Sequence, residues 1–506
     1  MKNYKYIGLF LASLAITSCD VNNDLDEIPA NLPAEVELNT TGLDFSKYVA
    51  IGASFTAGYT DGAMFKAAQE NSFPNILASK FGTNFSQPLM NDNIGGLVFN
   101  GNVVASPRFY FDGAGPAVLP AVPTTQLGVP ASGAPFNNFG APGAKSFHLT
   151  FPGYGALNPY FGRMASGPTA TVLGDALARN PTFFTLSEVG GNDVLGYALS
   201  GGSGVDQTGN LDPSTYGGSD ITDPNVFAQV FSGMVNALTA NGAKGVVANV
   251  PYITNLANFT TVTYNAIPLD AATAGALNGG FAAYNGGLDQ ILAAKNAGAL
   301  PPQALSLLAN FDADEVARRK VSYQAGQNAV LILDEDLTDL SFLNPALTNM
   351  RQATPDDLIL LASSTILGTT VGGNPLAING VSVPLADQWV LTPEEQLAIK
   401  TATDSYNSTI ASVAASNPNV ALVDLKSVLE EASTGIKFDG YTMTTKLVVG
   451  GLISLDGVHL TARGYALMAN KILAAMDAKF GTNFTTATNG LAKAGNYPTN
   501  YSPALR

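Results

Sequence analysis

The amino-acid sequence predicts an α/β fold in which a parallel β-sheet is sandwiched between helices. Four short apolar runs have the length and composition of buried strands, at residues 48–51, 182–187, 245–250 and 420–423. Segments with the apolar spacing of helices lie between and beside them, at residues 61–81, 225–241, 391–415 and about 424–432. Strands that alternate with helices are typical of a parallel sheet in an α/β sandwich.

The composition indicates a well-buried globular protein. Hydrophobic residues make up 46% and charged residues 12% of the 506 residues, which excludes a disordered chain. The net charge of −15 gives no basic surface for nucleic acid. The single cysteine excludes an internal disulfide and a thiolate metal site.

The first 44 residues predict a leader and a tether. Residues 1–18 contain two lysines and then an apolar run that is suited to a signal peptide and too short for a typical membrane span. The run ends in Ile-Thr-Ser before Cys19, which resembles a bacterial lipobox. This resemblance implies that Cys19 is lipidated and anchors the protein to the bacterial outer membrane, on its periplasmic or cell-surface face. The alternative is an ordinary secretory signal with a stray cysteine. Residues 19–44 are acidic and predict a tether.

Beyond the tether, the pattern divides the chain into four parts. Residues 45–254 and 391–480 carry the α/β alternation, and residues 481–506 form a C-terminal tail. Residues 255–390 interrupt the alternation and contain no recognisable motif. We expect an insertion there that packs beside the site as a lid or cap, or that is a purely structural elaboration. Residues 87–140, rich in Gly, Pro and Asn, predict a long structured loop region.

Three glycine-rich turns offer polar groups. Ser54 follows the first strand, so it is presented at the carboxyl end of a strand, where ligands bind in open α/β sheets. Gly143 lies in a Gly-Ala-Pro-Gly turn whose backbone can approach a ligand closely. Asn192 follows two glycines after another strand and offers an amide suited to stabilising an oxyanion. The alternative for Ser54 and for Gly143 is a purely structural turn.

The sequence contains only two histidines, and one of them has an aspartate three residues before it. Asp456 precedes His459 across a glycine, and can accept a proton from the far ring nitrogen of the histidine. A histidine titrates near neutral pH, as a base that activates a hydroxyl must. The alternative is a surface loop with a hydrogen-bonded histidine. His148 lacks an acidic neighbour in sequence, so we expect it to be a packed or rim histidine.

Together these turns supply the nucleophile, base, orienting acid and oxyanion donors that acyl transfer requires. Their combination and order resemble the SGNH (GDSL-type) hydrolase family, over about residues 47–480. The matching blocks are Gly-Ala-Ser-Phe-Thr-Ala-Gly at residues 52–58, Asn-Phe-Gly-Ala-Pro-Gly at 138–143, Gly-Gly-Asn-Asp at 190–193, and Asp-Gly-Val-His at 456–459.

The resemblance implies a three-layer α/β/α sandwich of the SGNH type, with 255–390 as a large insertion. It implies that Ser54 is the nucleophile, that His459 is the base and that Asp456 orients it. The oxyanion hole would comprise the Ser54 N–H, the Gly143 N–H and the Asn192 amide. No metal and no cofactor are implied. Ala53 replaces the family's Asp before the serine, so we expect altered support of that turn and retained chemistry.

These residues predict a lipid-anchored serine esterase or lipase acting on carboxylic esters. Its partners would be an ester substrate, either an acyl lipid or an acylated glycan, and the membrane reached through Cys19. The first alternative is a carbohydrate O-deacetylase that uses the same site. The second is a surface lipoprotein that binds a glycan or lipid on this scaffold without turnover.

Overall fold

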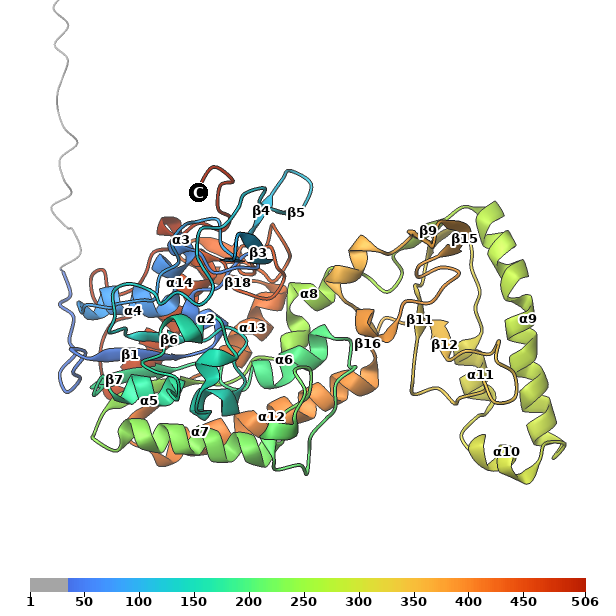
Figure 1. Cartoon of the computed structure of the whole chain (residues 1–506), viewed down its shortest axis with the longest axis horizontal. Helices are drawn as coiled ribbons and strands as arrows, with labels where there is room; N and C mark the ends of the chain where they lie inside the picture. Colours follow the sequence, from blue (N-terminus) through green and yellow to red (C-terminus); the bar gives the residue numbers. More distant parts are fainter. Residues whose placement is uncertain (1–34) are drawn as a thin grey trace, which may run out of the picture.

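The computed structural model describes residues 35–506. The predicted signal peptide at residues 1–18, the lipidation site Cys19 and the first part of the tether therefore lie outside the described residues. Within residues 35–506, no helix is long and apolar enough to cross a membrane. In Figure 1 the described chain forms a large α/β body and a smaller body, built mainly from residues 255–390, that projects from its side.

Five parallel strands form the central sheet of the α/β body (Figure 1), in the spatial order β6-β1-β7-β8-β17. They are β1 (Tyr48–Gly52), β6 (Asn138–Gly140), β7 (Phe183–Leu186), β8 (Lys244–Ala248) and β17 (Val420–Val423). The four strands predicted from apolar runs are confirmed. The fifth, β6, is too short for its apolar pattern to stand out. Strands β6 and β7 lie on opposite sides of β1, so the loops that follow β1 and β7 lead in opposite directions. In open α/β sheets, ligands bind in the crevice between two loops that diverge in this way.

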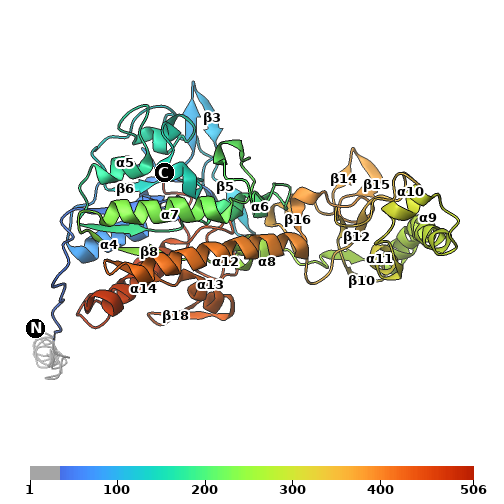
Figure 2. The same ribbon diagram turned by 90° about the horizontal axis from the view of Figure 1, so that it is seen from below.

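Helices cover both faces of the sheet (Figures 1 and 2), which confirms the predicted α/β architecture. The helices α4 (Phe73–Phe81) and α14 (Ala462–Phe480) pack together on one face. The other face carries α5 (Val172–Leu177), α7 (Pro224–Thr239) and α12 (Pro393–Ser416). On the first face, the ring of Phe183 in β7 meets those of Phe81 and Phe480 edge to face, at centroid distances of 5.5 and 6.5 Å.

Local sequence signals set the ends of the helices that support the site. Thr392 and Glu395 form a reciprocal capping box at the start of α12, with Pro393 at its first position. Thr461 accepts the Gly464 N–H and so caps α14. The repeated segment Lys-Phe-Gly-Thr-Asn-Phe ends both α4 and α14, at glycines with φ of 66° and 73°. Glycine adopts this left-handed conformation without steric cost.

Residues 61–81 were predicted as one helix, and this prediction is wrong. The segment forms a turn and then two helices, α3 (Lys66–Glu70) and α4. Pro74, near the start of α4, has no N–H to donate to the preceding turn, so a continuous helix would lose a hydrogen bond there. The predicted loop region 87–140 contains two short hairpins before β6, formed by β2 (Leu97–Phe99), β3 (Asn102–Ala105), β4 (Phe109–Phe111) and β5 (Pro116–Val118).

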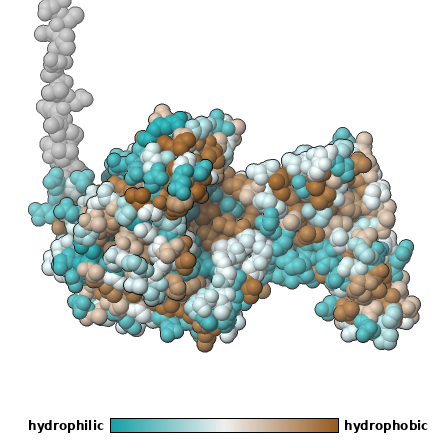
Figure 3. Space-filling model, in the orientation of Figure 1, coloured by the Kyte–Doolittle hydropathy of each residue, from teal (hydrophilic) through white to brown (hydrophobic). Residues whose placement is uncertain are grey.

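The 255–390 segment has two apolar cores of its own. Phe281 and Leu288 of the long helix α9 (Ala271–Asn296) belong to one core, and Val330 and Ile359 belong to the other. Its remaining helices and strands are short: α8 (Ala257–Thr260), β9 (Ile267–Leu269), α10 (Pro302–Leu307), α11 (Ala313–Arg319), β10 (Gly326–Asn328), β11 (Leu331–Leu333), β12 (Met350–Gln352), β13 (Leu358–Ile359), β14 (Thr370–Val371), β15 (Asn374–Ile378) and β16 (Val390–Leu391). Figure 3 shows a hollow between this segment and the α/β body, with apolar residues in it.

A short hairpin precedes α14. After α13 (Leu425–Thr434), the strands β18 (Ile436–Phe438) and β19 (Tyr441–Met443) pair before α14 begins.

The C-terminal tail packs onto the α/β body. The fully buried guanidinium of Arg108 donates to the carbonyls of Ser502 and Leu505, at 2.8 and 3.1 Å. Residues 481–506 are therefore part of the folded body.

Candidate active site

Ser54 lies at the first position of the short helix α2 (Ser54–Ala57), which is separated from the end of β1 by Ala53 alone. The turn is so tight that a Cβ atom at Gly52 would lie 2.2 Å from Thr56 Oγ1 and 2.6 Å from the Ser187 carbonyl oxygen. Only glycine fits at Gly52. The Ser54 side chain is largely enclosed, with 8% of the residue exposed, and it lines a cavity.

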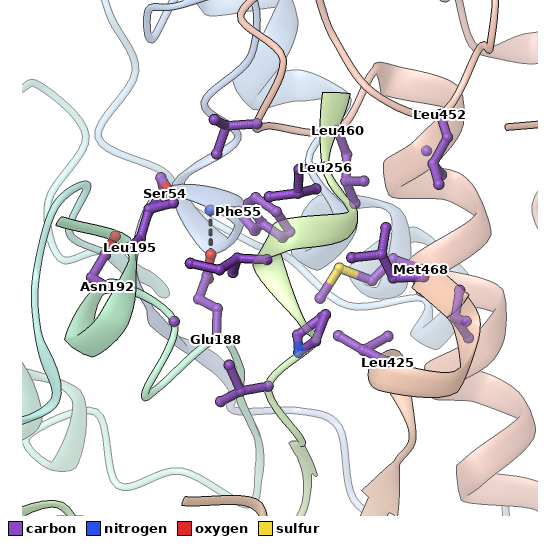
Figure 4. Close-up of a pocket in the computed structure, with 18 of the residues that line it drawn as sticks. Ser54, Phe55, Glu188, Asn192, Leu195, Leu256, Leu425, Leu452, Leu460 and Met468 are labelled. Carbon is purple, nitrogen blue, oxygen red and sulfur yellow. Dashed lines mark hydrogen bonds between the residues drawn. The ribbon is translucent and has the colours of Figure 1, made fainter. Parts of the chain in front are cut away.

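Glu188 supports this turn, and the sequence analysis missed its role. It follows β7, and its buried carboxylate accepts hydrogen bonds from the backbone N–H groups of Ala53, Phe55 and Thr56 and from the Thr56 hydroxyl, at 2.5–3.1 Å. Figure 4 shows Glu188 below the Ser54 turn. The turn at Ala53 is therefore supported by a carboxylate that follows the neighbouring strand β7. The sequence signal that could have revealed this role of Glu188 is an acidic residue just after a buried strand.

The surroundings of Glu188 disfavour its ionised form. Burial raises the pKa of Glu188 to about 7, although the four donors oppose this rise. Its backbone φ of 53° is also unusual for a residue other than glycine. Such strain persists only where surrounding contacts enforce it, and here the contacts hold the turn that carries Ser54.

Replacing Glu188 with glutamine should change the pH dependence of stability. Because the folded state resists ionisation of Glu188, the wild-type protein should lose on the order of 3 kcal/mol relative to Glu188→Gln as the pH rises from about 4.5 to above 7. Denaturant unfolding at pH 4.5, 6 and 8 measures this difference. Glu431→Gln, at an exposed site on α13, is the matched control and should follow the wild type. A constant difference between wild type and Glu188→Gln at all three pH values would contradict the burial argument.

The three predicted oxyanion donors come from three loops. Asn192 begins α6 (Asn192–Leu199), and its side-chain amide donates to the Ala144 carbonyl at 2.9 Å. This bond joins the Asn192 loop to the Gly143 turn, where Gly143 has a φ of 78° and open space beside its Cα. The backbone N–H groups of Ser54 and Gly143 have no hydrogen-bond partner within residues 35–506. Both remain available to a ligand.

Asp456 and His459 form the predicted pair. The Nδ1 atom of His459 lies 2.9 Å from Oδ2 of Asp456, and Oδ1 accepts the backbone N–H groups of Val458 and His459. The Gly62 N–H also donates to Oδ2, at 2.7 Å. Burial acts to raise the pKa of Asp456, but the charge and hydrogen bonds of His459 outweigh it and hold this pKa well below the ordinary value. Asp456 is thus an anion at hydrogen-bond distance from Nδ1 of His459, which is the contact that orients the imidazole in a Ser-His-Asp triad.

The His459 ring lies beside the helix that carries Ser54. Its centroid is 5.8 Å from that of Phe55, which follows Ser54 in α2, and 4.6 Å from that of Tyr59, just beyond the end of α2. Within residues 35–506, no hydrogen bond joins the Ser54 hydroxyl to the His459 ring. Nucleophile and base commonly close this contact only when substrate is bound.

His148 has a different environment. Its Nδ1 accepts the Lys145 N–H at 3.1 Å, and its ring stacks on Tyr154 at a centroid distance of 4.6 Å. Burial, together with the charge of Lys145, lowers the pKa of His148 to about 4. It is a packed histidine, as predicted from the absence of an acidic neighbour.

An apolar cavity of about 100 Å³ begins at Ser54 and Asn192 (Figure 4). Glu188 and Gly191 also line its polar end. The rest of its wall is apolar and comes from α6, the loop after β8, α13 and α14, including Leu195, Val250, Ile253, Val428, Leu429, Leu467 and Met468. Of the 255–390 segment, only Leu256 reaches the wall, so the two cores of that segment lie outside this cavity.

No protein-family model, no curated protein and no solved structure matches the chain.

Proposed function

We propose that this protein is a lipid-anchored serine hydrolase of the SGNH type that cleaves carboxylic esters with an apolar acyl group. The observation that carries the proposal is the position of Ser54 and Asn192 at the polar end of an otherwise apolar cavity. The Asp456–His459 pair lies next to the same turn. A cleft with few polar groups at one end and an apolar wall suits a ligand with a carbonyl head and a hydrocarbon tail.

In the proposed reaction, Ser54 Oγ attacks the ester carbonyl while His459 Nε2 takes the hydroxyl proton. The anion of Asp456 stabilises the imidazolium that forms. The carbonyl oxygen becomes an oxyanion and accepts hydrogen bonds from the N–H groups of Ser54 and Gly143 and from the Asn192 amide. His459 then protonates the leaving alcohol, and water that it activates hydrolyses the acyl-enzyme.

The length of the preferred acyl chain tests the substrate class. Each methylene buried in the cavity should raise kcat/KM about fourfold over the acetyl ester until the cavity is full, because burying one CH₂ contributes about 0.8 kcal/mol. A series of p-nitrophenyl esters from acetate upward measures this, beside an acetylated glycan. Val428→Trp, in the cavity wall, should shorten the preferred chain, whereas Leu422→Trp, at an exposed site on β17, should not. A clear preference for the acetylated glycan would favour the deacetylase instead.

Removing the Asn192 amide should slow turnover. We expect Asn192→Ala to lower kcat by about 10²–10³-fold with a smaller change in KM, because an oxyanion donor acts mainly in the transition state. Steady-state kinetics on the best p-nitrophenyl ester give both values. Asn225→Ala, at an exposed site on α7, is the control and should behave as wild type. An unchanged kcat in Asn192→Ala would remove Asn192 from the oxyanion hole.

A further inference from the structure

Three acidic side chains meet where the 255–390 segment joins the α/β body. Glu335 follows β11, Asp387 lies shortly before β16, and Glu395 lies in the first turn of α12. Each offers a carboxylate oxygen, and these three oxygens lie within 4.8 Å of one another. Glu335 is exposed, Asp387 is half-buried and Glu395 is buried. Carboxylates packed this closely repel one another unless a positive charge lies between them.

The buried Glu395 carboxylate has one oxygen without a hydrogen-bond partner. Only 5% of the residue is exposed, and its Oε2 caps α12 by accepting the Thr392 N–H at 2.7 Å. Its buried Oε1 has no hydrogen-bond partner. A buried carboxylate oxygen without a donor is costly, and a bound ion or water is one way in which folded proteins satisfy it.

No side chain within residues 35–506 supplies the missing charge. None of the three acids forms a salt bridge there, and the nearby Arg351 is already paired with Asp334 and Asp357.

We propose that Glu335, Asp387 and Glu395 bind a calcium ion that fastens the 255–390 segment to the α/β body. Ca²⁺ takes oxygen ligands at 2.3–2.6 Å, so ligands on opposite sides of it stand about 4.8 Å apart. The exposed side of the group leaves room for water to complete the coordination. Mg²⁺ demands near-ideal octahedral geometry, which fits less well with three acids from separate segments, one of them held by its helix cap.

The ion would also brace the end of helix α6. The loop after α6 lies directly against the acidic group, since a Cβ atom at Gly202 would be 1.7 Å from Glu395 Oε1 and one at Gly201 would be 2.1 Å from the Asp387 carbonyl oxygen. Helix α6 begins at Asn192. The ion is structural, because none of its three ligands lines the cavity at Ser54. The expectation that no metal takes part in the ester chemistry is unaffected.

Thermal unfolding of the full-length protein after EDTA treatment and dialysis tests the site. CaCl₂ at a hundredfold excess over its dissociation constant should raise the Tm by about 3 °C. Isothermal titration calorimetry should find one Ca²⁺ per chain, and Mg²⁺ should give a smaller rise in Tm. Esterase activity well below the unfolding temperature should persist in EDTA.

Two matched variants locate the ligands. Glu335→Gln changes an exposed side chain and should abolish the rise in Tm, whereas Glu394→Gln, beside Glu395 on the exposed side of α12, should keep it. The proposal is overturned if the wild type neither binds Ca²⁺ nor gains in Tm, or if Glu335→Gln retains the full response. A larger rise with Mg²⁺ would overturn the assignment to calcium. If Ca²⁺ leaves the Tm of the wild type unchanged and Glu395→Gln has a higher Tm than the wild type, the carboxylates share a proton instead.

Discussion

Replacing Ser54 with alanine should lower kcat on a p-nitrophenyl ester by about 10³-fold or more. The variant keeps the cavity, the Asn192 amide and the Asp456–His459 pair, but it has no oxygen that can form the acyl-enzyme. The residual rate would come from the oxyanion donors and from substrate binding. Steady-state kinetics on purified protein, with circular dichroism to confirm folding, measure the loss.

Covalent labelling gives an independent measurement of the same serine. A fluorophosphonate probe should label the wild-type protein and fail to label Ser54→Ala. Ser187→Ala is the matched control, because Ser187 is also buried at the end of a central strand and its hydroxyl has no hydrogen-bond partner. It should label as wild type does. A folded wild-type protein that resists labelling and has no esterase activity would favour the non-catalytic binding lipoprotein.

Replacing His459 with alanine should cost about as much as replacing Ser54, because nucleophile and base act as a unit. His148→Ala should retain most of the wild-type kcat. The pKa of His148, lowered to about 4 by burial and the charge of Lys145, keeps its ring neutral at pH 7, and its Nδ1 is occupied by the Lys145 N–H. Kinetics and Tm separate the two variants, since His148→Ala should lower Tm through its lost contact with Tyr154. Activity lost in His148→Ala and kept in His459→Ala would show that the base assignment is wrong.

The elements that sequence reasoning placed well are those with strong local signals. The apolar run at residues 420–423 coincides with β17, and the helix predicted over residues 391–415 coincides with α12, whose start is set by the cap at Thr392 and Pro393. Both signals act over a few residues, through side-chain burial in one case and through a capped helix end in the other. The interruption between α3 and α4 was missed because the apolar spacing continues across it, whereas the missing N–H of Pro74 ends the hydrogen bonding.

For the site, the sequence by itself determined which residue types stand in which turns. Ser54 follows a strand, Asn192 follows two glycines, and Asp456 precedes His459 at a spacing that lets the two side chains meet at 2.9 Å. These are local properties, because a turn of a few residues largely decides where its own side chains can point.

Only the tertiary structure decided which distant groups surround those residues. It brought the Glu188 carboxylate under the Ser54 turn, joined the Asn192 amide to the Gly143 loop, and enclosed an apolar cavity behind Ser54 between α13 and α14. It also gathered Glu335, Asp387 and Glu395 at the junction with the 255–390 segment. Such contacts join residues tens to hundreds of positions apart, and they depend on strand order and helix packing, which short sequence patterns do not record.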